Sequence, residues 1–542
     1  MMEPNNPYLD LTGALPVITE LGHQHLSDLV TDSHGPVYVW TGRVPPQTVA
    51  VAMARLSRSK DDARIIYLKE FAIGTGDEAD EKARTFVTGY GDDSVAQLVY
   101  IQYVLDGISN VMTKRVERKR LGNYLERSTR YVQFDQRDEN GKYPYYVPKN
   151  LPASLRKHYE VSLDSIFDAY STLVKKMTKF IRAKNRNLEG ETGRSAWLNS
   201  TRAAACDVAR VLLPVATTST VGVVQSAQGV EQLIIQLLSE PLQESQDIGM
   251  MLLREARKVV PMFLERADMP DRGGAITAFL ANNRNAIRGL AGELLVAPTE
   301  TSRIDNYLVR YGPHDELDLV GGMLFEESSL TLREIEQQVS GWPDEQKVRV
   351  YRAYMGERLN RRQRPGRATE EAHFTWEMDG RDYGTFRDIQ RHRLVDAMEW
   401  QRNTPHIGYE IPHLAAEAGF EMEFNAAFEQ SKELYDLMVE AGYPTEAQYA
   451  TLLGHEMVYR FTTNLRELFH ILELRTGPAG HSGYRKICGD MYEELKAVYP
   501  LAAKAMEPFI GKKEDEALSR LGAERATEFK RQRLGIATEE VE

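Results

Sequence analysis

Hydrophobic positions recur every three to four residues over much of the chain, which is the spacing of amphipathic helices. The pattern predicts helices over residues 48–58, 81–88, 94–118, 154–182, 200–213, 221–239 and 243–265, and again over 332–339, 344–361, 425–441, 446–476 and 484–509. Two short apolar runs, 35–40 and 319–325, predict strands instead. We therefore expect a mixed α/β (α+β) fold of two units, each a twisted sheet flanked by long helices.

Polar stretches divide the chain into four predicted parts. Residues 1–34 form a polar N-terminal extension, and a polar stretch over 300–318 places a boundary near 300, between a first unit at 35–299 and a second at 300–511. Residues 512–542 mix charge signs with few apolar positions, which is typical of a solvated helix or a frayed end. At roughly 100–200 residues per domain, 542 residues are enough for two domains with separate cores.

The two predicted units share a weak internal repeat. A single shift of the chain against itself brings the Asp-Gly pair at 106–107 onto that at 379–380, and the basic run at 118–121 onto that at 391–394. Both halves also follow the same order of strand, helix, basic triplet, long insertion and paired C-terminal helices. The sequence therefore indicates a duplication.

Composition narrows the range of partners. The chain has 67 basic and 79 acidic residues, a net charge of −12, which argues against broad nucleic-acid binding but allows local basic pockets for a phosphorylated small molecule. Without an apolar run near the roughly 18 residues of a membrane span, or a leader-like N-terminus, we expect a cytoplasmic protein that binds no membrane. The two cysteines, Cys206 and Cys488, lie far apart, so neither a disulfide framework nor a metal site is expected.

One motif in the first half is specific. Arg118-Lys119-Arg120 is followed by seven residues and then by Ser128-Thr-Arg130-Tyr. This run resembles the signature of the flavin-dependent thymidylate synthases, Arg-His-Arg, seven residues, then Ser-x-Arg-Tyr. The loop at 90–95, the helix at 51–57 and the Ala-Arg-x-x-Leu-Pro run at 209–214 resemble further segments of that family.

The second half carries the family's other motifs. Arg391-His392-Arg393 is an intact triplet, and residues 464–475 resemble the family's Asn-x-Arg-x-x-x-(Asn/His)-x-x-x-Leu-Arg helix. The first half has lost the corresponding features, with Lys119 at the central position of its triplet and no Asn-x-Arg pair over 226–232. The second half in turn lacks the serine and arginines of the first, with Gln401, Asn403 and Gln448 at those positions.

The resemblance implies that the sites are composite, because the family binds dUMP between subunits of a homotetramer. Carried over, the dUMP-binding residues are Glu126, Ser128, Arg130 and Arg210 of the first half and Arg391 of the second, with Arg475 as the catalytic residue that contacts uracil and favours its ionisation at N3. The FAD-binding residues are Ser94, Arg391, His392, Arg393, Asn464, Arg466 and His470. One complete site could survive in each pair of halves, and a homodimer of tandem chains would resemble the tetramer.

The residue types suit this chemistry. Arginine forks bind phosphate oxygens bidentately, and a basic triplet suits the negative charge near N1 of a reduced flavin. Each residue also has a simpler interpretation: Arg210 as a surface ion pair, the 391–393 triplet as a solvated basic run, and Arg475 as a helix-end arginine that interacts with the helix dipole. The G-x-G-x-x-A match at 74–79 places acidic residues where a pyrophosphate would lie, which indicates a surface turn.

The leading functional hypothesis is FAD-dependent methylation of dUMP to dTMP, with methylenetetrahydrofolate as carbon donor and NADPH as reductant. Two alternatives remain open at this point. One is a catalytically degenerate nucleotide- or flavin-binding homologue, motivated by the losses in both halves. The other is a flavoenzyme that acts on a different pyrimidine nucleotide.

Overall fold

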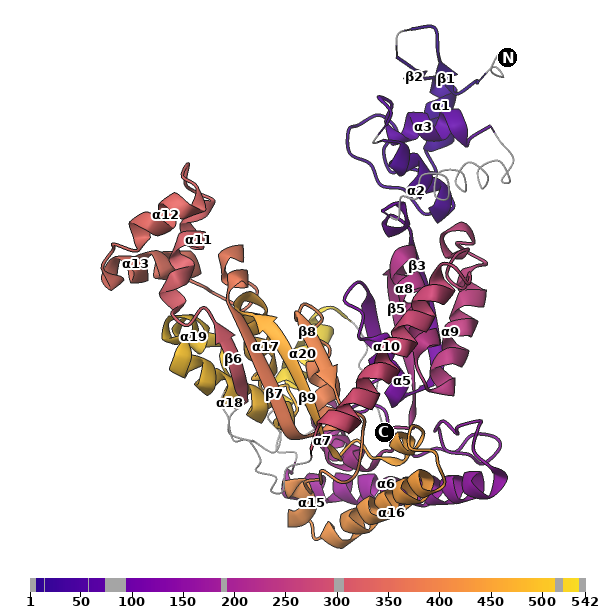
Figure 1. Ribbon diagram of the computed structural model, residues 1–542, viewed down its shortest axis with the longest axis vertical. Coiled ribbons are helices and arrows are strands. Elements are labelled where there is room, and N and C mark those ends of the chain that lie inside the picture. The colour runs from indigo at the N-terminus through magenta and orange to yellow at the C-terminus, as the bar shows by residue number, and fades with distance from the viewer. Residues whose placement is uncertain are drawn as a thin grey trace. The chain divides into compact units, whose positions relative to one another are not determined.

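A computed structural model describes residues 6–13, 15–56, 58–73, 94–186, 193–296, 307–511 and 520–535. Within these ranges the chain forms helices and small antiparallel sheets, which confirms the mixed α/β (α+β) expectation (Figure 1). None of the helices in the described ranges is long and apolar enough to cross a membrane.

The chain folds into two compact units. The first contains residues 1–106, 119–126 and 220–297, and the second contains 107–118, 127–219 and 298–542. The second unit therefore combines segments of both sequence halves. The four-part division expected from the sequence remains a prediction.

The first unit begins with a small N-terminal subdomain. Strands β1 (Leu9–Asp10) and β2 (Val17–Ile18) precede helices α1 (Glu20–Leu26), α2 (Pro46–Arg55) and α3 (Ala63–Glu70) and the short helix η1 (Val95–Gln97). Leu9, Leu26 and Val30 are buried against Leu68 of α3, so the polar N-terminal stretch shares a core with that helix. Burial of such side chains is worth roughly 2 kcal/mol each.

The first sheet has three strands in the order β3–β5–β4, namely β3 (Tyr100–Ser109), β4 (Asn123–Glu126) and β5 (Thr218–Ser226), and most of its residues belong to the first unit. Helices α8 (Ala227–Ser239), α9 (Gln243–Ala256) and α10 (Gly273–Leu294) and the short helix η3 (Met262–Leu264) follow it. β5 leads directly into α8, whose N-terminus is capped by the side chain of Ser226.

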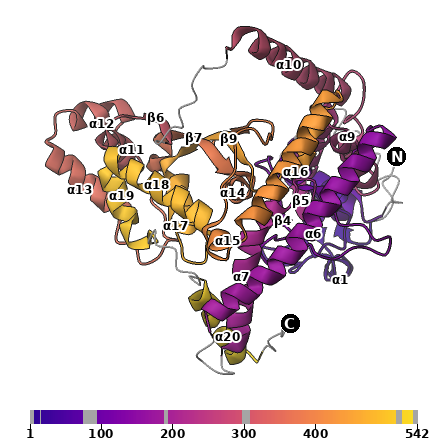
Figure 2. The ribbon, with the colours of Figure 1, turned by 90° about the horizontal axis from the view of Figure 1, so that it is seen from below.

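The second unit contains the longer helices of the first half. These are α5 (Asn110–Val116), α6 (Ala153–Lys184), α7 (Arg194–Ala209) and the short η2 (Arg210–Leu212). α6 packs beside α16 (Glu421–Glu440) of the second half (Figure 2). Leu163, Phe167 and Tyr170 are wholly buried along one face of α6. This face gives the helix its 3.6-residue hydrophobic period.

The second sheet lies in the second unit and has the antiparallel order β6–β7–β9–β8. Its strands are β6 (Leu308–Gly312), β7 (His373–Asp382), β8 (Ala397–Trp400) and β9 (Glu456–Asn464). Helices α14 (Tyr383–Ile389) and α17 (Leu465–Arg475) directly follow β7 and β9, and α18 (Ser482–Val498) and α19 (Pro500–Met506) follow α17. Trp376 of β7 and Phe461 of β9 are wholly buried and are directly paired in the register, so the core of this unit lies against the sheet.

The remaining elements of the second unit are shorter or peripheral. Helices α11 (Val320–Phe325), α12 (Leu332–Val339) and α13 (Asp344–Met355) form a small helical cluster between β6 and β7, with 3-10 helices η4 (Glu316–Leu319) and η5 (Arg367–Glu371) at its ends. The short α15 (His413–Glu417), η6 (Ala447–Ala450) and η7 (Glu507–Phe509) lie between larger helices or after α19. Helix α20 (Leu521–Arg533), in the charged C-terminal segment, buries none of its residues but packs against α7.

The structure repeats the sequence duplication. β3 and α5 of the first half correspond to β7 and α14 of the second, with the same lengths and the same offset along the chain, and β5 and α8 correspond to β9 and α17 at a second, shorter offset. Gly107 and Gly380 occupy the same position in their strands and both have positive φ, 70° and 68°. Only glycine adopts this backbone without strain, which explains why the Asp-Gly pair recurs.

The halves contact each other within the second unit through equivalent elements. The hydroxyl of Tyr383 in α14 donates to the carbonyl of Asn110 in α5, its equivalent position in the first half, over 3.0 Å. Pro214 forms an antiparallel bridge with Leu452, which is its equivalent at the offset that relates β5 to β9. Equivalent segments therefore pair as in a pseudo-dimer inside one chain.

Several predicted elements differ from the structure. Residues 319–325 form η4 and α11 rather than a strand, and 35–40 contain only an isolated bridge at Trp40. The predicted helices 94–118, 221–239 and 446–476 each contain most or all of a strand, β3, β5 and β9, ahead of the helix that ends the range. Along β5, buried residues alternate with partly exposed ones, which is the two-residue period of a strand. This alternation precedes the helical pattern of α8, and the predicted helix covers both. The helix predicted at 81–88 lies outside the described residues.

Helices predicted at 154–182 and 332–339 match α6 and α12. In both segments the amphipathic pattern of the sequence is uninterrupted, and both ends of the helix are clearly marked. α12 begins at a capping box formed by Thr331 and Glu334. Such long or well-capped helices are therefore the most predictable elements of the chain.

Candidate functional site

The candidate site lies in the second unit, where segments of both sequence halves meet. The first half supplies the loop containing Ser128 and Arg130 and the short helix η2, which begins at Arg210. The second half supplies the loop after α14, which carries Arg391 and His392, and the C-terminal end of α17, which is Arg475. The structure therefore brings together within one chain most of the residues that the sequence assigned to a composite site.

A buried carboxylate, Asp388, lies at the centre of these segments. Its Oδ2 is 3.7 Å from Nη2 of Arg210, and its Oδ1 is 3.5 Å from Arg391 and 3.9 Å from Arg475. Asp388 is the penultimate residue of α14, three positions before Arg391. Arginines from η2, the triplet and the end of α17 thus surround a single acidic side chain.

The electrostatics of Asp388 follow from this arrangement. Burial acts to raise the pKa of its carboxyl, but the guanidiniums of Arg210, Arg391 and Arg475 outweigh burial and lower the pKa to about 2. Within the described ranges, neither Asp388 Oδ2 nor Arg210 Nη2 has a hydrogen-bond partner, although both atoms are buried. The ionised Asp388 carboxylate and the Arg210 guanidinium therefore lie at ion-pair distance, and each has a buried atom that could still form a hydrogen bond. Such unused hydrogen-bonding atoms are suited to a polar ligand.

Arg130 binds a second carboxylate. Its Nε and Nη2 donate to Asp207 of α7 at 2.8 Å each, a bidentate pair, and its Nη1 lies 3.5 Å from the hydroxyl of Tyr484. The Ser128 hydroxyl accepts from the Arg130 backbone N–H at 3.2 Å, which fixes the turn of the loop. Arg130 is therefore held in place by the chain before any ligand binds.

A cavity of about 590 Å³ opens beside Arg130 and Asp207. Its walls include Arg381, Asp382, His481 and Arg485, together with residues of α7 and of the loop that contains α15. The volume falls within the range typical of small-molecule pockets. Arg130 thus belongs both to the predicted nucleotide-binding residues and to the wall of this cavity.

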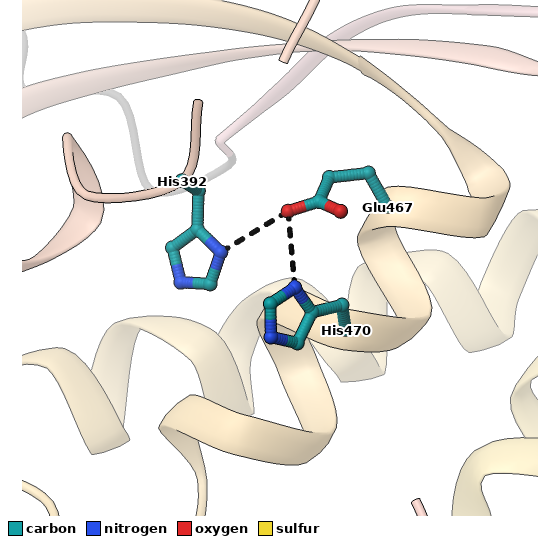
Figure 3. A group of neighbouring side chains, drawn as sticks. All are labelled: His392, Glu467 and His470. Carbon is teal, nitrogen blue, oxygen red and sulfur yellow. Dashed lines mark hydrogen bonds and ion pairs between the residues drawn. The ribbon is translucent and has the colours of Figure 1, made fainter. Parts of the chain in front are cut away.

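His392, Glu467 and His470 form a hydrogen-bonded group (Figure 3), and Arg475 contacts His392 from outside this group. Nδ1 of His392 and Nδ1 of His470 each lie 3.2 Å from the same oxygen of Glu467, Oε1. Glu467 and His470 are three residues apart on α17, so they share a face of that helix. On its other side, His392 accepts a hydrogen bond at Nε2 from Nε of Arg475, over 2.9 Å.

Burial sets the charge states within this group. Burial lowers the pKa of His392 to about 4, although Glu467 opposes the shift, so the imidazole is neutral near pH 7. Burial acts to raise the pKa of Glu467, but the hydrogen bonds from the two histidines outweigh it and lower the pKa to about 2. A neutral histidine therefore connects an ionised glutamate to a charged arginine.

Three further residues predicted to bind flavin lie next to this group: Arg391 precedes His392, Asn464 caps α17 and Arg466 precedes Glu467. The Asn464 side chain caps α17 by accepting from the Glu467 backbone N–H at 2.9 Å, and Arg466 donates to the carbonyl of Pro365 at 3.0 Å. The side chains of Arg391, Arg466 and His470 stay 41%, 33% and 31% exposed. These partly exposed side chains can reach a bound ligand, whereas Asn464 and the buried His392 have structural contacts inside the chain.

Two other predicted residues, Ser94 and Glu126, lie far from this group along the chain, whereas Arg393 is adjacent to it. Ser94 and Glu126 belong to the first unit, and their assigned roles remain predictions. Residues 90–93, which precede Ser94 in the resembling loop, lie outside the described residues. Arg393 follows His392 in the loop and is partly exposed.

Sequence reasoning missed three acidic residues: Asp207, Asp388 and Glu467. Each is three residues from a predicted site residue, Arg210, Arg391 and His470 respectively. On or next to a helix that spacing brings side chains together, so it was a usable signal. The motifs pointed to basic and hydroxyl residues, and the acids that balance their charge carry no motif of their own.

Comparison with known proteins identifies relatives of nearly full length. A "UPF0159 protein" of Chlamydia muridarum is 29% identical over 92% of this chain and 97% of its own length. Proteins described in the same way from Chlamydia pneumoniae and Thermoplasma acidophilum are 30% and 28% identical over 88% and 87% of this chain, and over 92% and 97% of their own lengths.

Among solved structures, the UMP/dUMP methylase PolB of Streptomyces cacaoi, bound with 5-Br dUMP, aligns with 40% of this chain and 99% of its own at 17% identity and a TM-score of 0.32. That likeness is too distant to bear on substrate.

The family model of the thymidylate synthase complementing proteins matches this chain over two segments, residues 42–262 and 325–501. The two matched segments correspond to the two halves of the repeat, as expected for a tandem arrangement. The chain therefore belongs to the thymidylate synthase complementing protein family.

Proposed function

We propose that this chain methylates dUMP to dTMP in an FAD-dependent reaction, with methylenetetrahydrofolate as carbon donor and NADPH as reductant. The observation that carries the proposal is the grouping of Arg130 and Arg210 from one half with Arg391 and Arg475 from the other, in a single unit. Membership of the thymidylate synthase complementing family agrees with a methyltransferase that acts on a pyrimidine nucleotide.

In this proposal different arginines bind different parts of the nucleotide. Arg130, with Ser128, and Arg210 bind the phosphate, because guanidinium forks suit a phosphate dianion. The cavity beside Arg130 gives the nucleotide room. Arg475 donates from Nε to His392, which orients its guanidinium. Its other N–H groups donate to the uracil carbonyls and stabilise negative charge on the uracil ring.

FAD bound beside Arg391, Arg466 and His470 would supply the hydride that converts the transferred methylene group to methyl. The chain's own residues bind the cofactor's phosphates through partly exposed donors and exclude water from the buried cluster around Asp388. The net reaction consumes dUMP, methylenetetrahydrofolate, NADPH and a proton and yields dTMP, tetrahydrofolate and NADP⁺.

Rescue of a thymidine auxotroph tests the proposal, with the Arg475→Ala chain as the matched control. We expect growth without thymidine from the wild-type chain alone, and a purified protein with flavin absorbance. A yellow protein that does not rescue would indicate a flavoenzyme for another pyrimidine nucleotide. A colourless protein that binds dUMP without rescue would indicate a degenerate homologue, and either result would overturn the proposed activity.

A further inference from the structure

Glu467 is the only member of the group in Figure 3 that the sequence had not connected with function, and it contacts both histidines. Its Oε1 accepts from His392 and from His470, while its Oε2 lies 3.8 Å from Nη1 of Arg364. Its side chain is 4% exposed. An ionised carboxylate buried in this way must be balanced by its neighbours, so its contacts are strongly constrained.

The protonation pattern around His392 follows from its partners. Arg475 Nε is a donor only, so Nε2 of the neutral His392 must carry the lone pair that accepts this bond. The ring proton of His392 is therefore on Nδ1, which donates to Glu467 Oε1. Without Glu467, that N–H would be buried with no acceptor, and the opposite tautomer would present an N–H to the Arg475 donor.

The same reasoning argues against a metal site here. One ligand atom from each of His392, Glu467 and His470 lies within 4.8 Å of the others, close enough to hold a divalent cation. A metal at His392 Nδ1 would require its lone pair, and the proton would then move to Nε2, facing the Arg475 Nε–H. Two donors would meet at 2.9 Å, so the group fits a hydrogen-bonded chain better than an ion.

We infer that Glu467 is a positioning residue that fixes the His392 tautomer and, through His392, the orientation of the Arg475 guanidinium toward the nucleotide base. The chain runs from His470 through Glu467 and His392 to Arg475, with hydrogen bonds of 3.2, 3.2 and 2.9 Å. It links the partly exposed His470 to the residue proposed to contact uracil. This inference rests on the proposed function for the identity of the base, but the tautomer of His392 does not depend on it.

A double-mutant cycle on dUMP binding measures whether Glu467 acts through Arg475. By calorimetry we expect Glu467→Ala to weaken binding about tenfold, as for loss of one charge-assisted contact. Glu467→Gln keeps an acceptor oxygen for both imidazoles, and we expect it to restore most of the affinity. In the Arg475→Ala background, Glu467→Ala should cause no further loss, and fully additive losses would overturn the inference.

Glu473→Gln is the matched control. Glu473 lies on the same helix, is equally buried and pairs with Arg358 at 2.6 and 2.7 Å, away from His392. We expect dUMP affinity in this variant to equal that of the wild-type chain. A loss of dUMP affinity in Glu473→Gln as large as that in Glu467→Ala would mean that the effect is general to the helix and would overturn the positioning role.

NMR of histidine-labelled protein tests the tautomer without any nucleotide. We expect His392 to be protonated at Nδ1 in the wild-type chain and in Glu467→Gln, and to lose this preference in Glu467→Ala. An unchanged tautomer in Glu467→Ala would overturn the inference even if dUMP binds. Failure of dUMP to bind the wild-type protein, together with the expected tautomer change, would overturn the proposed function and leave the positioning of Arg475 by Glu467 supported.

Discussion

Asp388→Asn removes the carboxylate that three arginines share while keeping the side chain's shape. At an effective dielectric constant near 20, two unit charges 3.7 Å apart, the Arg210–Asp388 distance, attract by about 4 kcal/mol. Arg475 adds a second buried interaction, whereas Arg391 is 41% exposed and contributes less because water screens it. Removal of one partner from a buried ion pair costs about 3–5 kcal/mol, since the other charge stays behind uncompensated.

We therefore expect Asp388→Asn to lower the free energy of unfolding by about 3 kcal/mol at pH 7 in phosphate-free buffer. Inorganic phosphate should restore part of that loss, because an anion can replace the missing carboxylate among the guanidiniums. Urea denaturation with and without phosphate measures both effects. Asp436→Asn is the control: its partner His406 is half exposed, and that pair should contribute under about 1 kcal/mol.

The reasoning would be refuted by an Asp388→Asn protein as stable as the wild-type chain in the absence of anions. A second contrary result would be equal stabilisation of both proteins by phosphate. In either case the three arginines would not depend on Asp388 for charge balance, and the cluster could not be regarded as a preformed anion site.

Further predictions concern the flavin, the composite site and pH. Arg391→Ala should strip FAD from the purified protein whereas Lys119→Ala should not, as measured by flavin absorbance; equal loss would contradict an asymmetric site. Arg130→Ala and Arg475→Ala should each abolish dUMP-dependent turnover, and mixing the two variants should restore none of it, because both residues belong to one unit of one chain; recovery on mixing would place the site between chains. Restoring the first-half pattern in the second half, by Gln401→Ser with Asn403→Arg, should add no activity in the same turnover assay. The pKa of His392 is lowered from 6.5 to about 4, so between these pH values the unfolded chain binds a proton that the folded chain does not. His392 should therefore lower the free energy of unfolding by about 3 kcal/mol as pH falls from 6.5 to 4, in addition to the loss from His455, whose pKa burial lowers to about 3. A His392→Gln chain that loses as much stability as the wild-type chain over that range, in urea titrations, would assign the effect elsewhere.

The sequence grouped most of the residues that the structure brings together at the candidate site, but it missed several strands. Arg391, His392 and Arg475 could be assigned because short motifs carry residue types that few other functions need at that spacing. β3, β5 and β9 were missed because each leads directly into a helix, so that one apolar pattern continues across the junction. At these junctions the boundary is marked only by a change in the spacing of hydrophobic residues, from every second residue in the strand to about every 3.6 residues in the helix.

The acidic partners could not be chosen from the sequence alone. Asp388 lies three residues from Arg391, but its contact with Arg210 joins residues of different halves and depends on how the halves pair. The contact between His392 and Glu467 also depends on the fold, although both residues belong to the second half. They lie on separate elements and meet only because α14 and α17 follow neighbouring strands of one sheet. The spacing of three residues on one helix was a signal that could have placed Glu467 beside His470, but only the fold could place it beside His392.

The duplication explains why one chain would hold one productive site of this kind. The correspondence of α14 with α5 places Arg115 of the first half at the position of Asp388, and that of α17 with α8 places Leu237 at the position of Arg475. Leu237 is wholly buried and has no polar group to offer a base. Arg115 would add positive charge where the other half has its balancing carboxylate. The losses in the first half therefore extend beyond the catalytic motif to the charges that support it. The first half can keep its role in folding and in completing the site of the second half while it loses its own chemistry.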